Sequence, residues 1–312
     1  MKGVVTKSTG SWYTVFSEEK GVIECRLKGK FRIQGIKSTN PVAVGDYVLF
    51  ELEEGKNTGV ITEILDRKNY IIRKSVNLSK QTHIIAANID IAFLIVTIDN
   101  PPTFTGFIDR FLATAEAYSI KAVLLFNKLD TYNNEELGKL AELEIIYTDI
   151  GYQCIAISAT KKIGVDEVQA LMVGKTTMFS GHSGVGKSTL INAIEPGLNL
   201  KTAEVSKTHK QGMHTTTFAE MFKLSFGGYI IDTPGIKGFG VVDFAQEEIT
   251  DFFPEFFALK SECKFNNCIH VNEPKCAIKK AVETGEIAYS RYKSYLQMLQ
   301  GEEENYRIDI YN

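Results

Sequence analysis

The order of the nucleotide-binding motifs along this chain limits the folds that it can adopt. The run Asn127-Lys128-Leu129-Asp130, which is typical of guanine recognition, precedes a glycine-rich loop that begins at Gly181. The run Asp232-Thr233-Pro234-Gly235 comes after that loop. In an ordinary GTPase the phosphate loop comes first and NKxD comes late. We therefore expect a circularly permuted GTPase domain whose chain is cut between the DxxG and NKxD elements.

The permutation gives the γ-phosphate-sensing segment a new neighbour in the chain. After Gly235 the chain runs directly into its C-terminal third instead of into the next strand of the GTPase sheet. We expect the region that folds after residue 240 to respond to the nucleotide state.

Length and composition favour a globular protein of two or three domains, since the 312 residues are 44% hydrophobic and 23% charged. The longest apolar run, Ile91 to Ile98, is far shorter than the ~20 residues of a membrane span. The N-terminus lacks the apolar segment of a signal peptide, so we expect a cytoplasmic protein. The net charge is −3, although residues 1–75 carry 13 Lys and Arg against 9 Asp and Glu. Such a local excess suits contact with nucleic acid, and an ordinary solvated surface explains it equally well.

The pattern of apolar, polar and turn residues along the sequence predicts three domains. Residues 1–72 contain five short apolar-rich stretches separated by turn residues, which indicates an OB-fold or another small β-barrel. Residues 73–240 alternate strands and helices, which predicts a mostly parallel α/β domain with ligand loops at the carboxyl ends of its strands. Residues 241–312 are helical in period and include a cysteine cluster, which predicts a helical metal-binding domain.

The glycine-rich loop lies between a predicted strand at 176–180 and a predicted helix, as a phosphate-binding loop requires. Glycines allow backbone N–H groups to approach phosphates, and the helix N-terminus adds favourable partial charge. We expect Lys187 to reach the β- and γ-phosphates and Ser188 to bind Mg²⁺. The loop residues expected to bind the nucleotide are Gly181, His182, Ser183, Gly184, Val185, Gly186, Lys187, Ser188 and Thr189.

Specificity for guanine rests on the residues after two other predicted strands. The carboxylate of Asp130 can accept hydrogen bonds from guanine N1 and N2, whereas adenine has no such donor pair. We expect Asn127 to hold the loop and contact N7, and Lys128 to pack along the base. Ser158 and Ala159 come after the next strand, and a backbone N–H there is expected to reach guanine O6.

Hydrolysis requires further groups around the γ-phosphate. We expect Asp232 to hold Mg²⁺ through water and the Gly235 amide to sense the γ-phosphate. One of Thr215, Thr216 and Thr217 is expected to contact Mg²⁺ and the γ-phosphate. A Ras-like GTPase has a water-orienting Gln just after DxxG, and the residue here is Ile236. The domain is therefore expected to be slow alone, with His214 as the internal candidate to orient or deprotonate water.

A second cluster has the spacing of a metal site. Cys263, Cys268, His270 and Cys276 supply three thiolates and an imidazole within fourteen residues. Four such ligands suit a closed tetrahedral Zn²⁺ site with no position left for catalysis. We interpret it as a structural metal site that stabilises a small helical domain. Cys25 and Cys154 are isolated and are expected to pack in cores.

The complete order of elements resembles the ribosome small-subunit-dependent GTPase A family (RsgA) over essentially the whole chain. The resemblance rests on Ala86-Ala87-Asn88-Ile89-Asp90, on the phosphate loop, on His214-Thr215-Thr216-Thr217, on Phe253-Pro254-Glu255-Phe256, and on the cysteine cluster. Met213 is a departure, since the family usually has Arg at that position.

This resemblance implies a bacterial GTPase that acts in late maturation of the 30S ribosomal subunit and is stimulated by that subunit. It also implies that the barrel contacts 16S rRNA. We expect GTP and GDP as ligands, no membrane, one structural Zn²⁺, Mg²⁺ with GTP, and a monomer. Two other interpretations stay open: a GTP-binding switch or scaffold without significant turnover, and a GTPase that delivers zinc. The closed Cys3His spacing argues against the latter.

Overall fold

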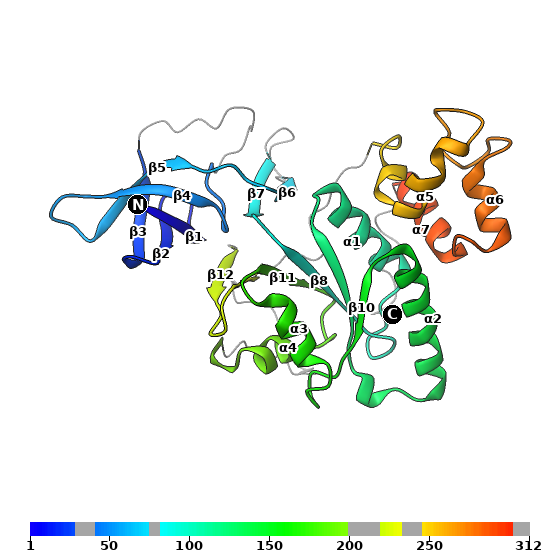
Figure 1. The fold of residues 1–312 in the computed structure, drawn as a ribbon, viewed down its shortest axis with the longest axis horizontal. Helices are drawn as coiled ribbons and strands as arrows, with labels where there is room; N and C mark the ends of the chain where they lie inside the picture. The colour runs from blue at the N-terminus through cyan, green and yellow to red at the C-terminus, as the bar shows by residue number, and fades with distance from the viewer. Residues whose placement is uncertain (29–40, 75–81, 199–218, 233–244, 302–312) are drawn as a thin grey trace, which may run out of the picture. The chain divides into compact units, whose positions relative to one another are not determined.

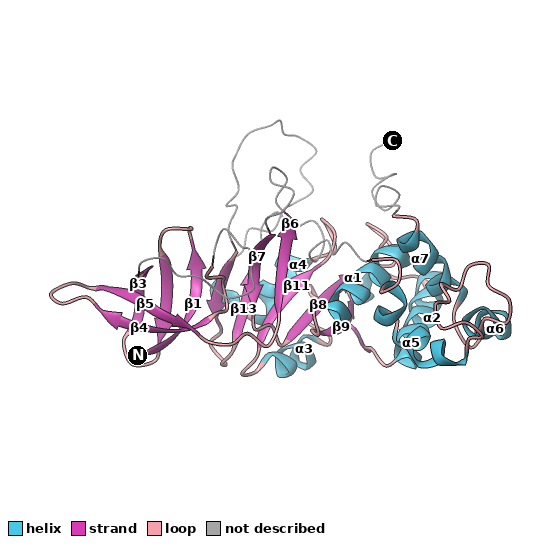
Figure 2. Ribbon diagram, turned by 90° about the horizontal axis from the view of Figure 1, so that it is seen from above, coloured by secondary structure: helices cyan, strands magenta, loops and turns pink. Residues whose placement is uncertain are grey.

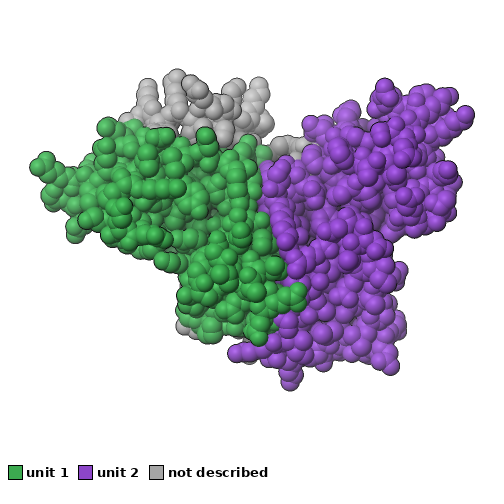
Figure 3. Space-filling model, viewed as in Figure 1, with its two compact units in different colours: residues 1–93, 165–180, 188–241 green, residues 94–164, 181–187, 242–312 purple. Residues whose placement is uncertain are grey.

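The computed structural model divides the chain into two compact units (Figure 3). Unit 1 comprises residues 1–93, 165–180 and 188–241, and unit 2 comprises residues 94–164, 181–187 and 242–312. The residues that the structure describes are 1–28, 41–74, 82–198, 219–232 and 245–301. Both units are assembled from segments that are far apart in the sequence, as expected of a chain whose motifs are permuted.

Unit 1 begins with the predicted five-stranded barrel. Its strands are β1 (Lys2–Ser8), β2 (Tyr13–Ser17), β3 (Gly21–Leu27), β4 (Tyr47–Leu52) and β5 (Thr58–Ile64). The hydrogen-bonded order is β1-β2-β3-β5-β4, and β4 also pairs with β1, which closes the barrel. Val5, Val15, Phe50 and Ile61 point inward and are fully buried. The alternation of apolar and polar residues in these strands therefore produced the predicted barrel.

Unit 1 also contains elements from the predicted α/β domain (Figure 1). Its remaining strands are β6 (Tyr70–Lys74), β7 (Thr82–Ala87), the start of β8 (Ile91–Val96), β11 (Thr176–Ser180), β12 (Glu220–Lys223) and β13 (Tyr229–Asp232). Its helices are α3 (Val165–Met172), α4 (Lys187–Ile194) from Ser188 onward, and the 3-10 helix η2 (Pro196–Leu198). β11 is parallel to β13, and β12 is antiparallel to it. The barrel joins this sheet where Lys7 of β1 pairs with Glu220 of β12.

Unit 2 combines a parallel strand pair with most of the helices (Figure 2). Its elements are the end of β8, α1 (Thr105–Ala117), β9 (Lys121–Phe126), η1 (Leu129–Thr131), α2 (Asn134–Ile150), β10 (Gln153–Ala156), η3 (Ile249–Phe252), α5 (Pro254–Leu259), η4 (Lys260–Glu262), α6 (Ala277–Thr284) and α7 (Tyr289–Leu299). Pro254 interrupts the helical pattern as predicted, because it occupies the first turn of α5.

Two helices of unit 2 illustrate how the sequence sets their limits. Asn133 caps α2 by accepting from the backbone amides of Glu135 and Glu136, and the Glu136 side chain accepts from the Asn133 amide in return. Gly151 ends the same helix in the left-handed conformation. α1, by contrast, has no side-chain cap and is buried on more than one face, so packing stabilises it. Within the described part of the chain, no helix is both long and apolar enough to cross a membrane.

Candidate nucleotide site and metal centre

The residues predicted to recognise guanine come directly after two adjacent strands of unit 2. β9 and β10 are parallel, and Phe126 lies opposite Ala156 at their carboxyl ends. The amide of Ile157 donates to the carbonyl of Phe126 over 2.7 Å, which extends the pairing past the assigned strands. Asn127 and Ser158 therefore leave the sheet at the same edge, where ligand loops gather in α/β domains.

Asn127 connects three segments at this edge. Its side chain is 2% exposed. Its Oδ1 accepts from the backbone N–H of Ala159 over 3.0 Å, and its Nδ2 donates to the carbonyl oxygen of Val185 over 2.8 Å. Its own backbone N–H donates to the carbonyl of Val96, the last residue of β8, over 2.8 Å. One buried amide thus fixes the NKLD loop, the Ser-Ala loop and the phosphate loop to one another.

The close approach of the phosphate loop to Asn127 requires glycine at position 186. The φ angle of Gly186 is +97°, and a Cβ built there would lie 2.4 Å from Asn127 Nδ2. A side chain at this position would both strain the backbone and displace the amide. The third glycine of the motif is therefore needed for contact with NKLD as well as for space around phosphates.

The carboxylate of Asp130 is exposed and is oriented by two hydroxyl groups. Ser158 Oγ donates to its Oδ1, and Thr160 Oγ1 donates to its Oδ2 over 3.2 Å. The bond from Ser158 is the main reason that the pKa of Asp130 lies below its ordinary value. An ionised carboxylate with its oxygens held in this way is ready to accept hydrogen bonds from a guanine edge.

The other two predicted base contacts are also placed near this loop. Lys128 adopts a left-handed conformation with φ of 71°, and its ammonium group donates to the carbonyl of Asn100 in the loop after β8. The backbone N–H of Ala159 donates to Asn127, and that of Ser158 donates to the carbonyl of Ile163 over 3.0 Å. A contact between Ala159 and guanine O6 therefore stays a prediction.

The phosphate loop connects β11 to α4. Val185 is fully buried, whereas Ser183 and Gly184 are exposed at the tip of the loop. The imidazole of His182 packs on the ring of Phe107 in α1, with centroids 3.8 Å apart and ring planes tilted by 33°. Burial of the imidazole lowers the pKa of His182. Lys187, Ser188 and Thr189 form the first turn of α4, which places them at a helix N-terminus.

The predicted Mg²⁺-binding Asp232 is the last residue of β13. β13 is parallel to β11, with Ile231 opposite Met178, so the chain leaves both strands at the same edge of the unit 1 sheet. This arrangement directs Asp232 to the edge from which the phosphate loop starts. His214, Thr215, Thr216, Thr217 and Gly235, together with Met213 and Ile236, lie outside the described residues.

Sequence reasoning missed several residues that shape this site. Phe107 supports His182, Asn100 accepts from Lys128, and Thr160 binds Asp130. The Tyr132 hydroxyl donates to the carbonyl of Asn127 and accepts from the amide of Ile98 over 2.9 Å. Only Thr160 carried a local signal, because it comes directly after the Ser-Ala pair.

The four predicted metal ligands come together in unit 2, with their donor atoms within 4.8 Å of one another. Cys263 Sγ lies 3.9 Å from Cys276 Sγ and 3.6 Å from His270 Nδ1, and His270 Nδ1 lies 3.3 Å from Cys276 Sγ. A tetrahedral Zn²⁺ with Zn–S of about 2.3 Å and Zn–N of about 2.0–2.1 Å separates two sulfurs by about 3.8 Å and a sulfur from a nitrogen by about 3.6 Å. The separations among Cys263, His270 and Cys276 therefore match a metal ion of this size, and the Cys268 sulfur lies within 4.8 Å of the other donor atoms.

The surroundings of the cluster suit thiolate ligands. The backbone amides of Ala277 and Lys279 point at Cys263 Sγ and Cys276 Sγ, each over 3.4 Å. These bonds lie at the N-terminus of α6, where partial positive charge favours anions. The hydroxyl of Tyr292 donates to the carbonyl of His270 over 2.7 Å and fixes the ligand loop to α7. Donor type, spacing and burial all fit a structural metal centre.

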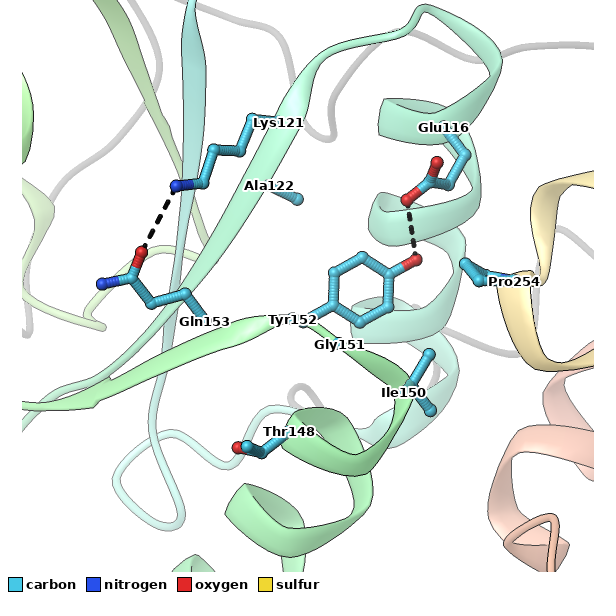
Figure 4. Close-up of a pocket in the computed structure, with 9 residues that line it drawn as sticks. All are labelled: Glu116, Lys121, Ala122, Thr148, Ile150, Gly151, Tyr152, Gln153 and Pro254. Carbon is cyan, nitrogen blue, oxygen red and sulfur yellow. Dashed lines mark hydrogen bonds between the residues drawn. The ribbon is translucent and has the colours of Figure 1, made fainter.

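A pocket of about 480 Å³ in unit 2 lies elsewhere in the fold (Figure 4). It is lined by Lys121 and Gln153, the first residues of β9 and β10, and by Tyr152, whose hydroxyl donates to Glu116 over 3.0 Å. These positions lie at the amino ends of the strands. The nucleotide motifs lie at the carboxyl ends, so this pocket is not part of the nucleotide site.

Comparison with known proteins agrees with this geometry. The family described as RsgA GTPase matches residues 64–242, and the RsgA N-terminal domain matches residues 2–61. A protein of Christiangramia forsetii called small ribosomal subunit biogenesis GTPase RsgA is 67% identical over 100% of this chain and 99% of its own length. Proteins of the same name from Flavobacterium johnsoniae and Bacteroides fragilis are 65% and 57% identical, and the alignments cover 100% and 97% of this chain and 96% and 98% of theirs.

Two solved structures have the same fold. The crystal structure of YjeQ from Thermotoga maritima is 40% identical with a TM-score of 0.78, and the match covers 96% of this chain and 97% of that one. The crystal structure of YloQ, a circularly permuted GTPase, is 31% identical with a TM-score of 0.74 over 96% of this chain and 94% of that one. The permuted order inferred from the motifs is thus found in a solved structure.

Proposed function

Because this chain belongs to the RsgA family of GTPases and hydrolyses GTP, we propose that its GTPase activity serves the biogenesis of the small ribosomal subunit. Relatives that are 57% to 67% identical over nearly their whole length carry that function in their names. The observation that carries the assignment at the site is Asn127, which joins the motifs of the permuted chain by hydrogen bonds to Ala159 and Val185.

Each chemical role of a GTPase has a candidate side chain here. Asp130 selects guanine, and Lys128 packs along the base. Backbone amides of residues 181–187 bind the phosphates, while Lys187 neutralises their charge. Ser188 and Asp232 would hold Mg²⁺, which would offset the negative charge that develops during phosphoryl transfer. One of Thr215, Thr216 and Thr217 and the Gly235 amide complete the γ-phosphate contacts, and His214 positions the attacking water.

Zn²⁺ is the ion that the Cys3His cluster is proposed to hold. Three sulfurs and one imidazole whose donor atoms lie within 4.8 Å of one another suit a tetrahedral, closed site. The ion stabilises the small helical region that contains α5, α6 and α7, and no part of hydrolysis passes through it.

The partners are those of the proposed role. We expect the protein to act in the cytoplasm as a monomer that binds the 30S subunit through 16S rRNA. The barrel is a suitable RNA-binding element, because Lys2 lies over the exposed ring of Tyr47 with its ammonium group 5.1 Å from the ring centroid. GTP binding orders the γ-phosphate segments, and hydrolysis releases them, so that the complex with the subunit can dissociate.

The experiment that tests this function is GTP turnover by the purified protein alone and with 30S subunits, 50S subunits and 70S ribosomes in parallel. We expect a large stimulation that is specific to 30S subunits. Tight GTP binding with no stimulation by any particle would instead support a GTP-binding switch or scaffold without significant turnover. His214→Ala is then tested in the stimulated reaction, where loss of turnover with GTP binding intact is expected.

A further inference from the structure

A buried arginine joins the metal-binding helices to the GTPase core within unit 2. Arg291 of α7 is 1% exposed. Its Nη1 donates to Oδ1 of Asp109 in α1 over 2.8 Å. Its Nε and Nη2 donate to the two carboxylate oxygens of Glu255 in α5 over 2.7 and 3.1 Å. Three helices that are distant in the sequence therefore meet at one guanidinium group.

The geometry of this contact requires an arginine. The planar guanidinium group binds Glu255 with two N–H groups while a third reaches Asp109, and its carbon lies 4.5 Å from the centroid of the Phe253 ring. The Tyr147 hydroxyl also donates to Asp109 Oδ1, over 2.8 Å. Among the described residues, Asp109 Oδ2 is buried without a hydrogen-bond partner. Arg291, Tyr147 and Ser294 of α7 all favour the ionised carboxyl group of Asp109, and Arg291 is the only one of the three that carries a charge. Removal of Arg291 would therefore leave this buried carboxyl group poorly compensated.

α1 links the Arg291–Asp109 contact to the phosphate loop. Residues two apart on a helix point to nearly opposite sides, because each residue turns the helix by about 100°. Asp109 points at α7, and Ala113, one turn later, packs with Ile249 and Phe253 in the core of the metal-binding helices. Phe107 lies two residues before Asp109, and its ring stacks on His182 of the phosphate loop with centroids 3.8 Å apart. α1 is thus held between α7 on one side and the phosphate loop on the other.

We propose that Arg291 is a positioning residue for nucleotide binding, which fixes α1 through Asp109 and thereby holds the phosphate loop through the contact between the Phe107 and His182 rings. This role rests on the phosphate-binding function proposed for residues 181–187. It gives the metal-binding helices a connection to the nucleotide site that is separate from the chain segment after Asp232. A purely structural role for Arg291 would stabilise the helices and leave the phosphate loop unchanged.

The test uses the full-length, metal-loaded protein labelled with ¹³C at histidine Cε1. The chain has five histidines, so the spectrum is simple, and His182→Gln identifies the His182 signal. Phe107→Leu gives the resonance position of a His182 that has lost its aromatic neighbour. We expect Arg291→Met to move the His182 proton resonance most of the way toward that position. Arg291→Lys keeps the positive charge but cannot bind both carboxylate oxygens of Glu255 as the planar guanidinium group does. We expect this variant to move the His182 resonance part of the way toward the same position.

The matched control is Tyr295→Phe on the same helix. Tyr295 is fully buried, and its hydroxyl contacts Thr250 Oγ1 and the carbonyl of Ile269, each over 3.0 Å. This variant loosens the same packing without touching Asp109, and we expect the His182 resonance to stay at its wild-type position. We also expect Arg291→Met to weaken GDP binding about 2- to 30-fold, the range of couplings carried through packed networks, and Tyr295→Phe to leave it unchanged.

If Arg291→Met does not fold, Asp109→Asn is measured instead, with a smaller displacement of the same sign expected. A folded variant at either position with the wild-type His182 resonance and wild-type GDP affinity would overturn the proposal. Neither readout involves ribosomes. Failure here is therefore distinguishable from failure of the proposed role in subunit biogenesis, which rests on stimulation by 30S subunits.

Discussion

The side-chain amide of Asn127 donates to the carbonyl oxygen of Val185 over 2.8 Å, although 58 positions separate the two residues in the chain. In a permuted GTPase this bond joins a base-recognition loop to a phosphate loop that comes later in the sequence. The cut in the chain has moved the termini of the domain, and the contact between the two loops is still made. Asn127 and Val185 belong to the same compact unit, so the order of the motifs along the chain does not prevent this contact.

Removal of the Asn127 side chain is expected to damage nucleotide binding. Asn127→Ala leaves the Ala159 N–H and the Val185 carbonyl unpaired in a buried position, at about 1–3 kcal/mol for each group. We expect at least a tenfold loss of GTP affinity by calorimetry. Asn133→Ala, which removes the exposed cap of α2 at about 0.5–2 kcal/mol, is the control that lowers the stability of the fold and leaves GTP affinity intact. Equal affinities for the two variants would contradict the bridging role of Asn127.

A methyl group at position 186 is expected to abolish GTP binding. The Cβ of Gly186→Ala would lie 2.4 Å from Asn127 Nδ2, and a φ of +97° is unfavourable for alanine. Gly151→Ala is the matched control, because its φ is +107° and nothing lies within 4 Å of the added Cβ. Both variants are expected to lose stability in denaturant unfolding, and only Gly186→Ala is expected to lose GTP binding. Retained binding by Gly186→Ala would show that the loop does not depend on this close approach.

The pKa of Asp130 is expected to respond to Ser158. A carboxyl group whose pKa is lowered on folding stabilises the protein fully above its unfolded-state pKa of about 3.9, and this contribution disappears as the pH falls through the lower folded-state value. Ser158→Ala removes the main cause of the lowering, so the Asp130 pKa is expected to rise toward its ordinary value. The stability that this carboxyl group loses on acidification should then be smaller, and the loss should be complete at a higher pH, nearer to the unfolded-state pKa. Titration of the Asp130 carboxyl ¹³C resonance measures this directly, and Thr160→Ala should give a smaller shift of the same sign.

Loss of one cysteine ligand is expected to release the metal ion and to destabilise the C-terminal helices. Cys276 caps α6 and is proposed as a metal ligand, so Cys276→Ser should reduce bound zinc from about one ion per chain to nearly none. The thermal midpoint should fall with it. Cys154→Ser, at a half-buried position of β10 outside the cluster, should keep the ion. Elemental analysis of both variants decides the point, and full zinc occupancy in Cys276→Ser would refute the ligand assignment.

The parts of the fold that were predictable have local signals. Alternating apolar residues predicted the five barrel strands, and the continuous apolar run near Ile91 predicted β8, which is buried along its whole length. β6, β7 and α3 were missed, because short elements of mixed polarity have weak periodicity. The motifs predicted Asn127, Asp130 and the phosphate loop, because the residue types and spacing within each short motif are typical of a guanine-nucleotide site.

The contacts that complete the site could not be predicted from spacing. Phe107 has the pattern of an ordinary core helix, and nothing in the sequence pairs it with His182, 75 positions later. Arg291 has the pattern of a solvated helix residue, yet it is buried against Asp109, 182 positions earlier. Such pairings depend on the tertiary packing of several helices, which a single sequence does not encode in any local window.

The most direct test of the central claim is 30S-stimulated turnover of wild type and Asp130→Asn with GTP and with XTP. Xanthine carries a carbonyl oxygen where guanine carries its 2-amino group, so an asparagine amide should pair with it while an aspartate should not. We predict that 30S subunits stimulate GTP turnover by wild type, and that the variant loses GTP turnover and gains 30S-stimulated XTP turnover. Unchanged GTP turnover in Asp130→Asn would contradict the guanine site assembled from the permuted motifs.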